Sequence, residues 1–237
     1  MLTIGVLTPH AAPGPEVELP TIAPGCLVTR VERIAESDPP TTPSALRAMT
    51  APDVLYRAAE ALANDSLDAA VYASTTSAYV IGYDAEMTMV ARLASQLALP
   101  VVATCGSAVA ALRVLDVERI SLIGAPWFEP ELNELGATYF RSEGFDVISS
   151  RSAALSQDPA RIESPAVLEW VTRHVPDGAE AIFIGGNGFR AAGAIGALER
   201  AIGRPVLESN QVLLWGILTV TGTTLPVRGY GRLLERG

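Results

Sequence analysis

Residues Ile182–Trp215 read IFIGGNGFRAAGAIGALERAIGRPVLESNQVLLW, and this stretch decides the fold. The apolar run Ile182–Ile184 predicts a buried strand, and the glycines Gly185–Gly188 predict a turn directly after it. The spacing of apolar residues over Phe189–Ile202 predicts a helix, and Val206–Leu207 predicts a second strand before a polar turn. Because open α/β sheets bind ligands at turns that follow the carboxyl ends of strands, we expect a ligand near the glycine turn.

The same alternation runs outward along the rest of the chain. Apolar runs predict further strands at Leu2–Leu7, Leu27–Val31, Ala69–Tyr72, Val101–Ala103, Ile120–Ile123 and Val147–Ile148. Helical spacing predicts helices at Ala51–Ala63, Asp84–Leu97, Ser107–Leu115, Pro130–Glu143, Pro165–His174 and Gln211–Thr221. Strands that alternate with helices indicate a parallel sheet covered by helices.

The pattern runs twice, with Leu2–Leu7 and Ile120–Ile123 each opening one half. We therefore predict an α/β fold of two pseudo-symmetric, Rossmann-like lobes. Each lobe holds a mainly parallel four-stranded sheet, and a cleft separates the lobes. The first lobe is predicted to comprise residues 1–116 and 213–237, and the second residues 117–212. The proline-rich segment Ala11–Pro43 predicts one strand and a long loop that could cover the cleft.

Composition excludes several classes of function. The net charge is −9, which disfavours a nucleic-acid surface. No apolar run reaches the roughly 18 residues that a membrane span needs, and the amino-terminal residues lack the pattern of an export signal, so we expect a cytoplasmic protein. All 17 basic side chains are arginines, which excludes lysine Schiff-base chemistry. The two histidines and two cysteines show no metal-ligand spacing, and we expect neither a disulfide nor a metal nor another cofactor.

Several short motifs occur in an order that resembles one group of enzymes. They are Ile4–Pro9, Tyr72–Ser77, Asn133–Glu134, Gly185–Arg190, Ser209–Gln211 and Gly229–Leu233. Together they resemble the maleate isomerases and arylmalonate decarboxylases, a branch of the Asp/Glu racemase superfamily. The resemblance covers nearly the whole chain. It implies the two-lobed fold predicted above and a substrate that is a small carboxylic or dicarboxylic acid.

The resemblance also implies where the catalytic residues should lie, and there the chain departs from it. Maleate isomerases carry a cysteine where this chain offers Ser74 or Thr75, and the branch carries a Ser-Cys pair where this chain has Gly185-Gly186. The family arginine matches Arg190, whereas Trp127 stands in place of a pocket tyrosine. Both family cysteines are therefore missing, and a hydroxyl is a much poorer nucleophile than a thiolate.

Two residues are candidates for moving a proton. His10 follows the first strand directly and has a suitable reference pKa, although it could equally be a loop histidine that binds local backbone. Cys105 lies between a strand and a helix, where a thiol pKa can be lowered, and its alternative is a packed apolar role. The candidate substrate-binding residues are Pro9, Ser74, Thr75, Thr76, Ser77, Trp127, Gly186, Asn187, Gly188 and Arg190.

These features predict an isomerase or decarboxylase that acts through an enediolate-like state, held by the hydroxyl and N–H groups of the two turns. Decarboxylation or a related proton transfer ranks above cis–trans isomerisation, because only isomerisation needs the missing nucleophile. A non-catalytic carboxylate-binding protein and a Rossmann-like nucleotide-binding protein are the alternatives. We expect a small carboxylate as the partner, with no nucleic acid and no membrane, and the sequence is compatible with a homo-oligomer.

Overall fold

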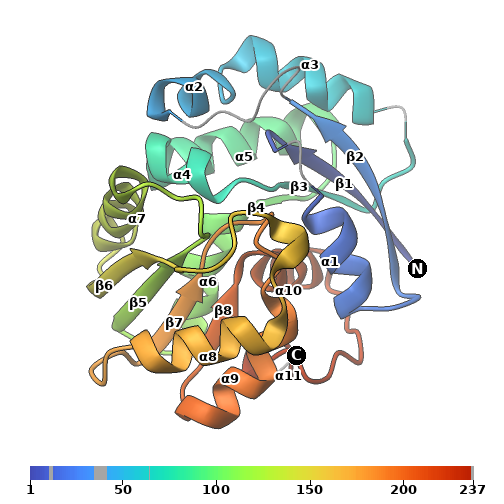
Figure 1. Cartoon of the computed structure of the whole chain (residues 1–237). Coiled ribbons are helices and arrows are strands. Elements are labelled where there is room, and N and C mark those ends of the chain that lie inside the picture. Colours follow the sequence, from blue (N-terminus) through green and yellow to red (C-terminus); the bar gives the residue numbers. More distant parts are fainter. Residues whose placement is uncertain (11–12, 35–41, 64, 236–237) are drawn as a thin grey trace.

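The protein folds into two parallel four-stranded sheets with helices packed around them (Figure 1). The computed structural model describes residues 1–10, 13–34, 42–63 and 65–235. The strands are β1 (Leu2–Thr8), β2 (Leu27–Arg33), β3 (Ala69–Tyr72), β4 (Val101–Ala103), β5 (Arg119–Gly124), β6 (Asp146–Ser152), β7 (Ala181–Ile184) and β8 (Val206–Glu208). The helices are α1 (Pro15–Ile22), α2 (Pro43–Ala48), α3 (Pro52–Leu62), α4 (Thr75–Ile81), α5 (Tyr83–Leu97), α6 (Thr104–Val114), α7 (Pro130–Ser142), α8 (Ser164–His174), α9 (Ile195–Ile202), α10 (Ser209–Thr221) and α11 (Arg232–Glu235), with 3₁₀ turns at Pro159–Arg161 and Ala192–Ala194.

The two sheets have the same topology. Their strand orders are β2-β1-β3-β4 and β6-β5-β7-β8, and the pairing is parallel throughout both. The central strands β3 and β7 consist of four buried residues each, as strands covered on both faces require. The predicted α/β fold of two similar lobes is therefore confirmed. The boundaries proposed for the lobes at residues 117 and 213 stay a prediction.

Three helices begin at places that the apolar pattern did not indicate. Helix α4 starts at Thr75, so the predicted turn Thr75–Ser77 is the first turn of a helix capped by the Ser74 side chain, whose Oγ accepts a hydrogen bond from Ser77 N at 3.2 Å. Helix α6 starts at Thr104 and helix α10 at Ser209, both directly after a strand. Polar residues at these helix starts hide the beginning of the apolar period.

The predicted helix Phe189–Ile202 was wrong at its start. A loop and a 3₁₀ turn fill the first part of that range, and helix α9 begins only at Ile195. The backbone of Arg190 lies in the left-handed region, with φ of 55°, which no α-helical residue adopts. Arg190 therefore does not lie in the first turn of a helix.

The segment Ala11–Pro43 contains a helix that the sequence pattern did not reveal. Helix α1 packs against β2 and α10, and Figure 1 shows it beside the carboxyl-terminal part of the chain. Residues 11–12 and 35–41 lie outside the described part of the chain, and so does that part of the expected loop.

Helix α10 joins the two halves. It starts directly after β8 of the second sheet and packs on β3, β4 and α6 of the first. Its first turn is fixed by a capping box, in which the Glu208 carboxylate accepts hydrogen bonds from the backbone N–H groups of Asn210 and Gln211 while the Gln211 side chain accepts one from Glu208 N. None of the described helices is long and apolar enough to cross a bilayer.

Candidate active site

The two predicted turns meet between the sheets, at the start of α4 and the loop after β7. The backbone N–H of Gly186 donates hydrogen bonds to Thr75 Oγ1 at 3.1 Å and to Ser209 Oγ at 2.9 Å. The two hydroxyl oxygens lie 3.1 Å apart, and all three residues are buried. We call this contact the Thr75–Gly186 junction.

Asn187 links the junction to residues of α6, α10 and α1. Its Oδ1 accepts hydrogen bonds from the hydroxyls of Thr75 and Thr104, both at 3.3 Å. Its Nδ2 donates to Asn210 Oδ1 at 2.9 Å, and Asn210 Nδ2 donates to a carboxylate oxygen of Glu18 at 2.6 Å. A line of hydrogen bonds thus runs from α1 through α10 to the loop after β7 and on to α4 and α6.

Gly186 is the residue that brings the two loops so close. Its φ is 113°, a backbone conformation that L side chains rarely adopt, and a Cβ added there would lie 2.8 Å from Ala125 Cβ. The neighbouring Gly188 is covered by the Trp127 ring, which packs edge-on against Phe189 with ring centroids 6.2 Å apart. Trp127 therefore packs beside the glycine loop, and its role in substrate binding stays a prediction.

The charge of Arg190 acts on an internal carboxylate, that of Glu18. Burial raises the pKa of Glu18 to about 7, and the hydrogen bonds from Asn210 and Ala192 together with the Arg190 charge counteract that rise. Burial and the nearby Glu18 raise the pKa of Glu208 well above its ordinary value. The Nε of Arg190 is buried and has no hydrogen-bond partner among the described residues.

His10 lies where it was predicted, just past the carboxyl end of β1. Its backbone N–H donates to Thr8 Oγ1 at 3.3 Å, and Thr8 Oγ1 in turn donates to the carbonyl of Ala73, next to the cap of α4. Burial, and then the charge of Arg33, lower the pKa of His10 to about 4. At neutral pH the imidazole is therefore uncharged, and it lacks the proton that a general acid must carry.

Cys105 lies inside the first turn of α6 and is fully buried, with its Sγ 3.7 Å from the carbonyl oxygen of Thr75. Burial and the neighbouring Glu86 carboxyl raise the pKa of the thiol well above its ordinary value. Its role in moving a proton stays a prediction. The environment disfavours that role, because a thiol that remains protonated at neutral pH cannot accept a proton as a thiolate.

Glu86 connects the lobes behind Cys105. The Tyr139 hydroxyl, from α7 of the second lobe, donates a hydrogen bond to Glu86 Oε2. Burial raises the pKa of Glu86 to about 7, against the lowering effect of the Tyr139 hydrogen bond and the N–H groups at the start of α6.

Thr76 has the feature expected of a group that awaits a ligand. Its side chain is buried, and its Oγ1 has no hydrogen-bond partner among the described residues. A buried hydroxyl without a partner costs about 1–3 kcal/mol of folding free energy, so its position near the helix start calls for a functional explanation.

The structure thus brings together Thr75, Gly186 and Asn187, with Ser74 as the cap of α4 and Trp127 over Gly188. Ser77 serves the cap, because the Ser74 hydroxyl donates to its Oγ at 2.8 Å, and Pro9 is buried between Thr8 and His10. The hydrogen bond that the structure gives His10 runs to Thr8 and not to the Thr75–Gly186 junction, and the placement of both in one cleft stays a prediction.

Sequence reasoning missed four residues of the network, which are Glu18, Thr104, Ser209 and Asn210. Ser209 and Asn210 belong to one of the motifs of the resemblance, which does not mark them as site residues. Glu18 gave no signal, because it lies in a helix that the proline-rich segment concealed. A polar residue directly after a buried strand was the usable signal for Thr104 and Ser209.

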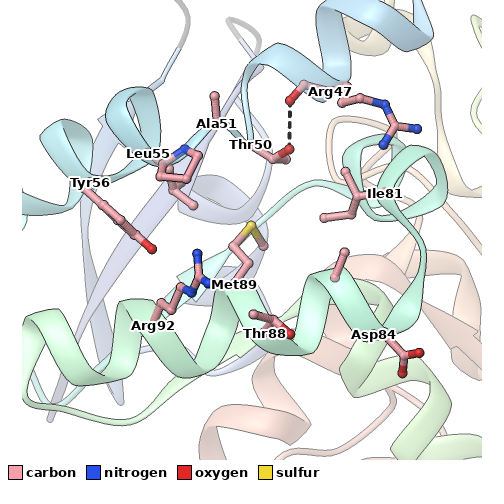
Figure 2. Close-up of a pocket in the computed structure, with 12 residues that line it drawn as sticks. Arg47, Thr50, Ala51, Leu55, Tyr56, Ile81, Asp84, Thr88, Met89 and Arg92 are labelled. Atoms are coloured by element: carbon pink, nitrogen blue, oxygen red, sulfur yellow. Dashed lines mark hydrogen bonds between the residues drawn. The ribbon is translucent and has the colours of Figure 1, made fainter.

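A surface pocket of about 580 Å³ lies elsewhere, between helices α2, α3, α4 and α5 (Figure 2). Arg47, Tyr56, Met89 and Arg92 are among the residues that line it. None of the predicted site residues does, so this pocket is separate from the Thr75–Gly186 junction. Among the described residues, no group of three or more His, Cys, Asp or Glu side chains is arranged to hold a metal ion.

Comparison with known proteins gives the same result from sequence and from structure. Residues 50–234 match the model of the arylmalonate decarboxylase family. The chain is 26% identical over 159 residues to an arylmalonate decarboxylase of Bordetella bronchiseptica, which covers 65% of this chain and 64% of that protein. It is 27% identical over 144 residues to a maleate isomerase of Pseudomonas putida KT2440, covering 57% of this chain and 55% of that one. These alignments therefore span less than two thirds of either relative.

Solved structures extend the likeness to the whole chain. A maleate cis-trans isomerase of Nocardia farcinica matches with a TM-score of 0.87 at 23% identity, over 100% of this chain and 99% of that one. An unliganded arylmalonate decarboxylase matches with a TM-score of 0.84 at 19% identity, over 100% of both chains. At such identities the structures establish a common fold, and the match over residues 50–234 establishes the family. The chain belongs to the arylmalonate decarboxylase family.

Proposed function

We propose that this protein is a cofactor-independent enzyme that acts on a small carboxylic acid at the Thr75–Gly186 junction. The reaction passes through an enediolate-like state and is a decarboxylation or a related proton transfer. A small carboxylate as the partner and the cytoplasm as the location are part of this proposal.

The observation that carries the proposal is the meeting of donors from two lobes. Gly186 N–H and the Thr75 hydroxyl lie in hydrogen-bond contact, and the unpartnered Thr76 hydroxyl follows in the same helix turn. An enediolate holds negative charge on two oxygens that share one carbon. Donors fixed in a buried place stabilise such developing charge without having to reorganise.

Cysteine chemistry is a poor alternative for this chain. The Nocardia farcinica maleate isomerase has been solved with a covalently bound succinylcysteine intermediate. Here Ser74 and Gly186 stand where the family cysteines are expected, and Cys105 is a buried, protonated thiol. Decarboxylation needs no such adduct: the bond from the α-carbon to the leaving carboxylate breaks, CO₂ departs, and the electron pair forms the enediolate. A proton then returns to the α-carbon. His10 is the proposed source, once the negative charge of the bound substrate has raised its pKa and the imidazole has taken a proton from solvent.

Deuterium incorporation tests the proposal without knowledge of the exact substrate. The purified protein is incubated in D₂O with monosubstituted malonates, including arylmalonates, and the products are followed by NMR. We expect loss of CO₂ and one deuterium at the α-carbon. Thr75→Ala should lower kcat about 10²–10³-fold, as for the loss of one donor to an anionic intermediate. Thr75→Ser is the matched control, because it keeps the hydroxyl, and it should retain most of the activity.

One observation favours a second function, that of a non-catalytic carboxylate-binding protein. Gly186 N–H already has two acceptors, Thr75 Oγ1 and Ser209 Oγ, and both family cysteines are missing. Saturable binding of these acids, with neither CO₂ release nor deuterium incorporation, would establish that function in place of the enzyme.

A further inference from the structure

The Tyr79 hydroxyl lies beside the glycine loop of the candidate site. A Cβ added to Gly185, the residue before the junction, would lie 3.0 Å from this hydroxyl and 3.2 Å from Thr75 Cγ2. The backbone of Gly185 lies outside the left-handed region, so its conformation does not require glycine. Room for the Tyr79 hydroxyl explains why position 185 carries no side chain.

The space that Tyr79 fills would hold another hydroxyl in the enzymes that this chain resembles. Those enzymes carry a serine before the cysteine, where this chain has Gly185 and Gly186. A serine hydroxyl is bonded directly to Cβ, so at position 185 it would lie next to the Tyr79 hydroxyl. This chain therefore lacks a hydroxyl in the loop after β7 and has one from α4 at nearly the same place.

The ring of Tyr79 is fixed between the two lobes. It comes from α4 and packs on α7, and Figure 1 shows these two helices side by side. A Cβ added to Gly136 in α7 would lie 2.6 Å from the ring, and the ring centroids of Tyr139 and Phe140 lie 6.0 and 6.3 Å away. Side chains of a helix lean towards its amino-terminal end, so the hydroxyl reaches from this packing towards Thr75, one turn earlier.

The Tyr79 hydroxyl is available to donate a hydrogen bond. The neighbouring Tyr139 hydroxyl donates to Glu86, whereas the Tyr79 hydroxyl has no hydrogen-bond partner within the described part of the chain. The side chain is only 6% exposed. Burial, and then the nearby Cys105 and Glu86, raise the pKa of Tyr79 well above its ordinary value, so the hydroxyl keeps its proton at neutral pH. A protonated, mostly buried hydroxyl without a partner is costly in the free protein and suits a ligand that accepts a hydrogen bond.

We propose that Tyr79 is a further catalytic residue, whose hydroxyl donates a hydrogen bond to one oxygen of the enediolate-like state at the Thr75–Gly186 junction. This inference rests on the proposed function. When the bond between the α-carbon and the leaving carboxylate breaks, the electron pair moves towards the oxygens of the carboxylate that remains. Tyr79 transfers no proton. Its hydroxyl stabilises the charge on one of those oxygens, and because the ring is already fixed, it does so without reorganisation.

The variant Tyr79→Phe removes the hydroxyl and keeps the ring in its packing. With phenylmalonate as the substrate, kcat should fall about 10²–10³-fold, the range for the loss of one donor to an anionic intermediate, with a smaller change in KM. The midpoint of urea unfolding should not fall, because the hydroxyl that is removed has no partner in the free protein. Tyr139→Phe is the matched control. It removes a hydroxyl that is bonded to Glu86, so it should lower that midpoint and change kcat far less.

Returning the hydroxyl to the glycine loop tests its place. Gly185→Ser alone should lower kcat, because its Cβ would lie 3.0 Å from the Tyr79 hydroxyl. In the Tyr79→Phe background the same serine has more room and supplies a hydroxyl at nearly the same position. The double variant should therefore recover part of the kcat that Tyr79→Phe loses. A loss of kcat in Tyr79→Phe that comes with a lower unfolding midpoint and is not recovered in the double variant overturns the proposal.

Binding of phenylacetate, the acid that remains when phenylmalonate loses CO₂, separates this inference from the proposed function. In calorimetric titrations Tyr79→Phe should weaken phenylacetate binding about 10–100-fold, the range for a hydrogen bond to a charged group. Equal kcat and equal affinity in Tyr79→Phe and the wild type overturn the role of Tyr79 and leave the proposed function standing. Binding that Tyr79→Phe weakens, without turnover of phenylmalonate by the wild type, overturns the proposed function and supports the Tyr79 donor. Failure of the wild type to bind phenylacetate or to turn over phenylmalonate at all overturns both.

Discussion

Replacing Gly186 with alanine tests how the two loops approach each other. Two costs arise, and the structure separates them. The first is conformational, because φ of 113° is open to glycine and strained for alanine, at about 1–3 kcal/mol. The second is steric, because the new Cβ would lie 2.8 Å from Ala125 Cβ and 3.4 Å from Phe128 Cζ. Overpacking of this kind costs about 1–3 kcal/mol, so we expect a total loss of about 2–6 kcal/mol in the free energy of unfolding.

Urea unfolding followed by tryptophan fluorescence measures this loss. Gly25→Ala is the matched control: Gly25 also has a positive φ, of 72°, but a Cβ there meets nothing within 4 Å. It should show the conformational cost alone. Adding Ala125→Gly to Gly186→Ala removes the closest contact and should recover part of the steric cost. The reasoning is refuted if Gly186→Ala destabilises the protein no more than Gly25→Ala does.

Two further predictions concern Glu86 and Cys105. Burial raises the pKa of Glu86 to about 7. Between about pH 4.5 and 7 the folded protein therefore holds a proton that the unfolded chain releases. The stability that this group contributes is present at low pH and is lost as the pH rises to 7. The free energy of unfolding of the wild type should therefore fall by up to about 3 kcal/mol relative to that of Glu86→Gln between pH 4.5 and 7. Urea unfolding at several pH values measures this difference. Parallel pH dependences for the two proteins would contradict the prediction. Cys105 should not react with a thiol reagent at pH 8 in the native protein, whereas the half-buried Cys26 should. The variant Cys26→Ser identifies which thiol reacts. Equal reaction rates for the two thiols of the wild type would show that Cys105 is accessible.

The fold was predictable because it depends on short buried strands. Runs such as Ala69–Tyr72 and Ile182–Ile184 have no charged residue. The first strand has the predicted bounds, and the second begins one residue earlier than predicted, at Ala181. Glycine-rich stretches were harder to interpret. The apolar residues near Arg190 predict a helix, yet the chain there forms a loop in which Arg190 has a left-handed backbone conformation. Tertiary contacts override a weak local preference at this place.

The site was predictable only where a polar residue follows a strand. Thr75 and Asn187 satisfied that rule and take part in the network. Glu18 and Arg33 gave no such signal, since the partner of each lies in another segment of the chain. Glu18 accepts a hydrogen bond from Asn210, 192 residues away, and Arg33 pairs with Glu16 across the connection between β1 and β2. Such pairings depend on topology, which a single sequence read locally does not contain.

The position of α10 has a consequence for synthesis of the chain. All four strands of the first sheet have been made by residue 103, but the helix that covers β3, β4 and α6 begins at Ser209. Leu213, Leu214 and Ile217 of this helix are fully buried. A chain emerging from the ribosome therefore completes the second sheet before the first lobe has its full cover. During that interval the amino-terminal half exposes apolar surface, and this is the stage at which a chaperone or a self-association event would act on it.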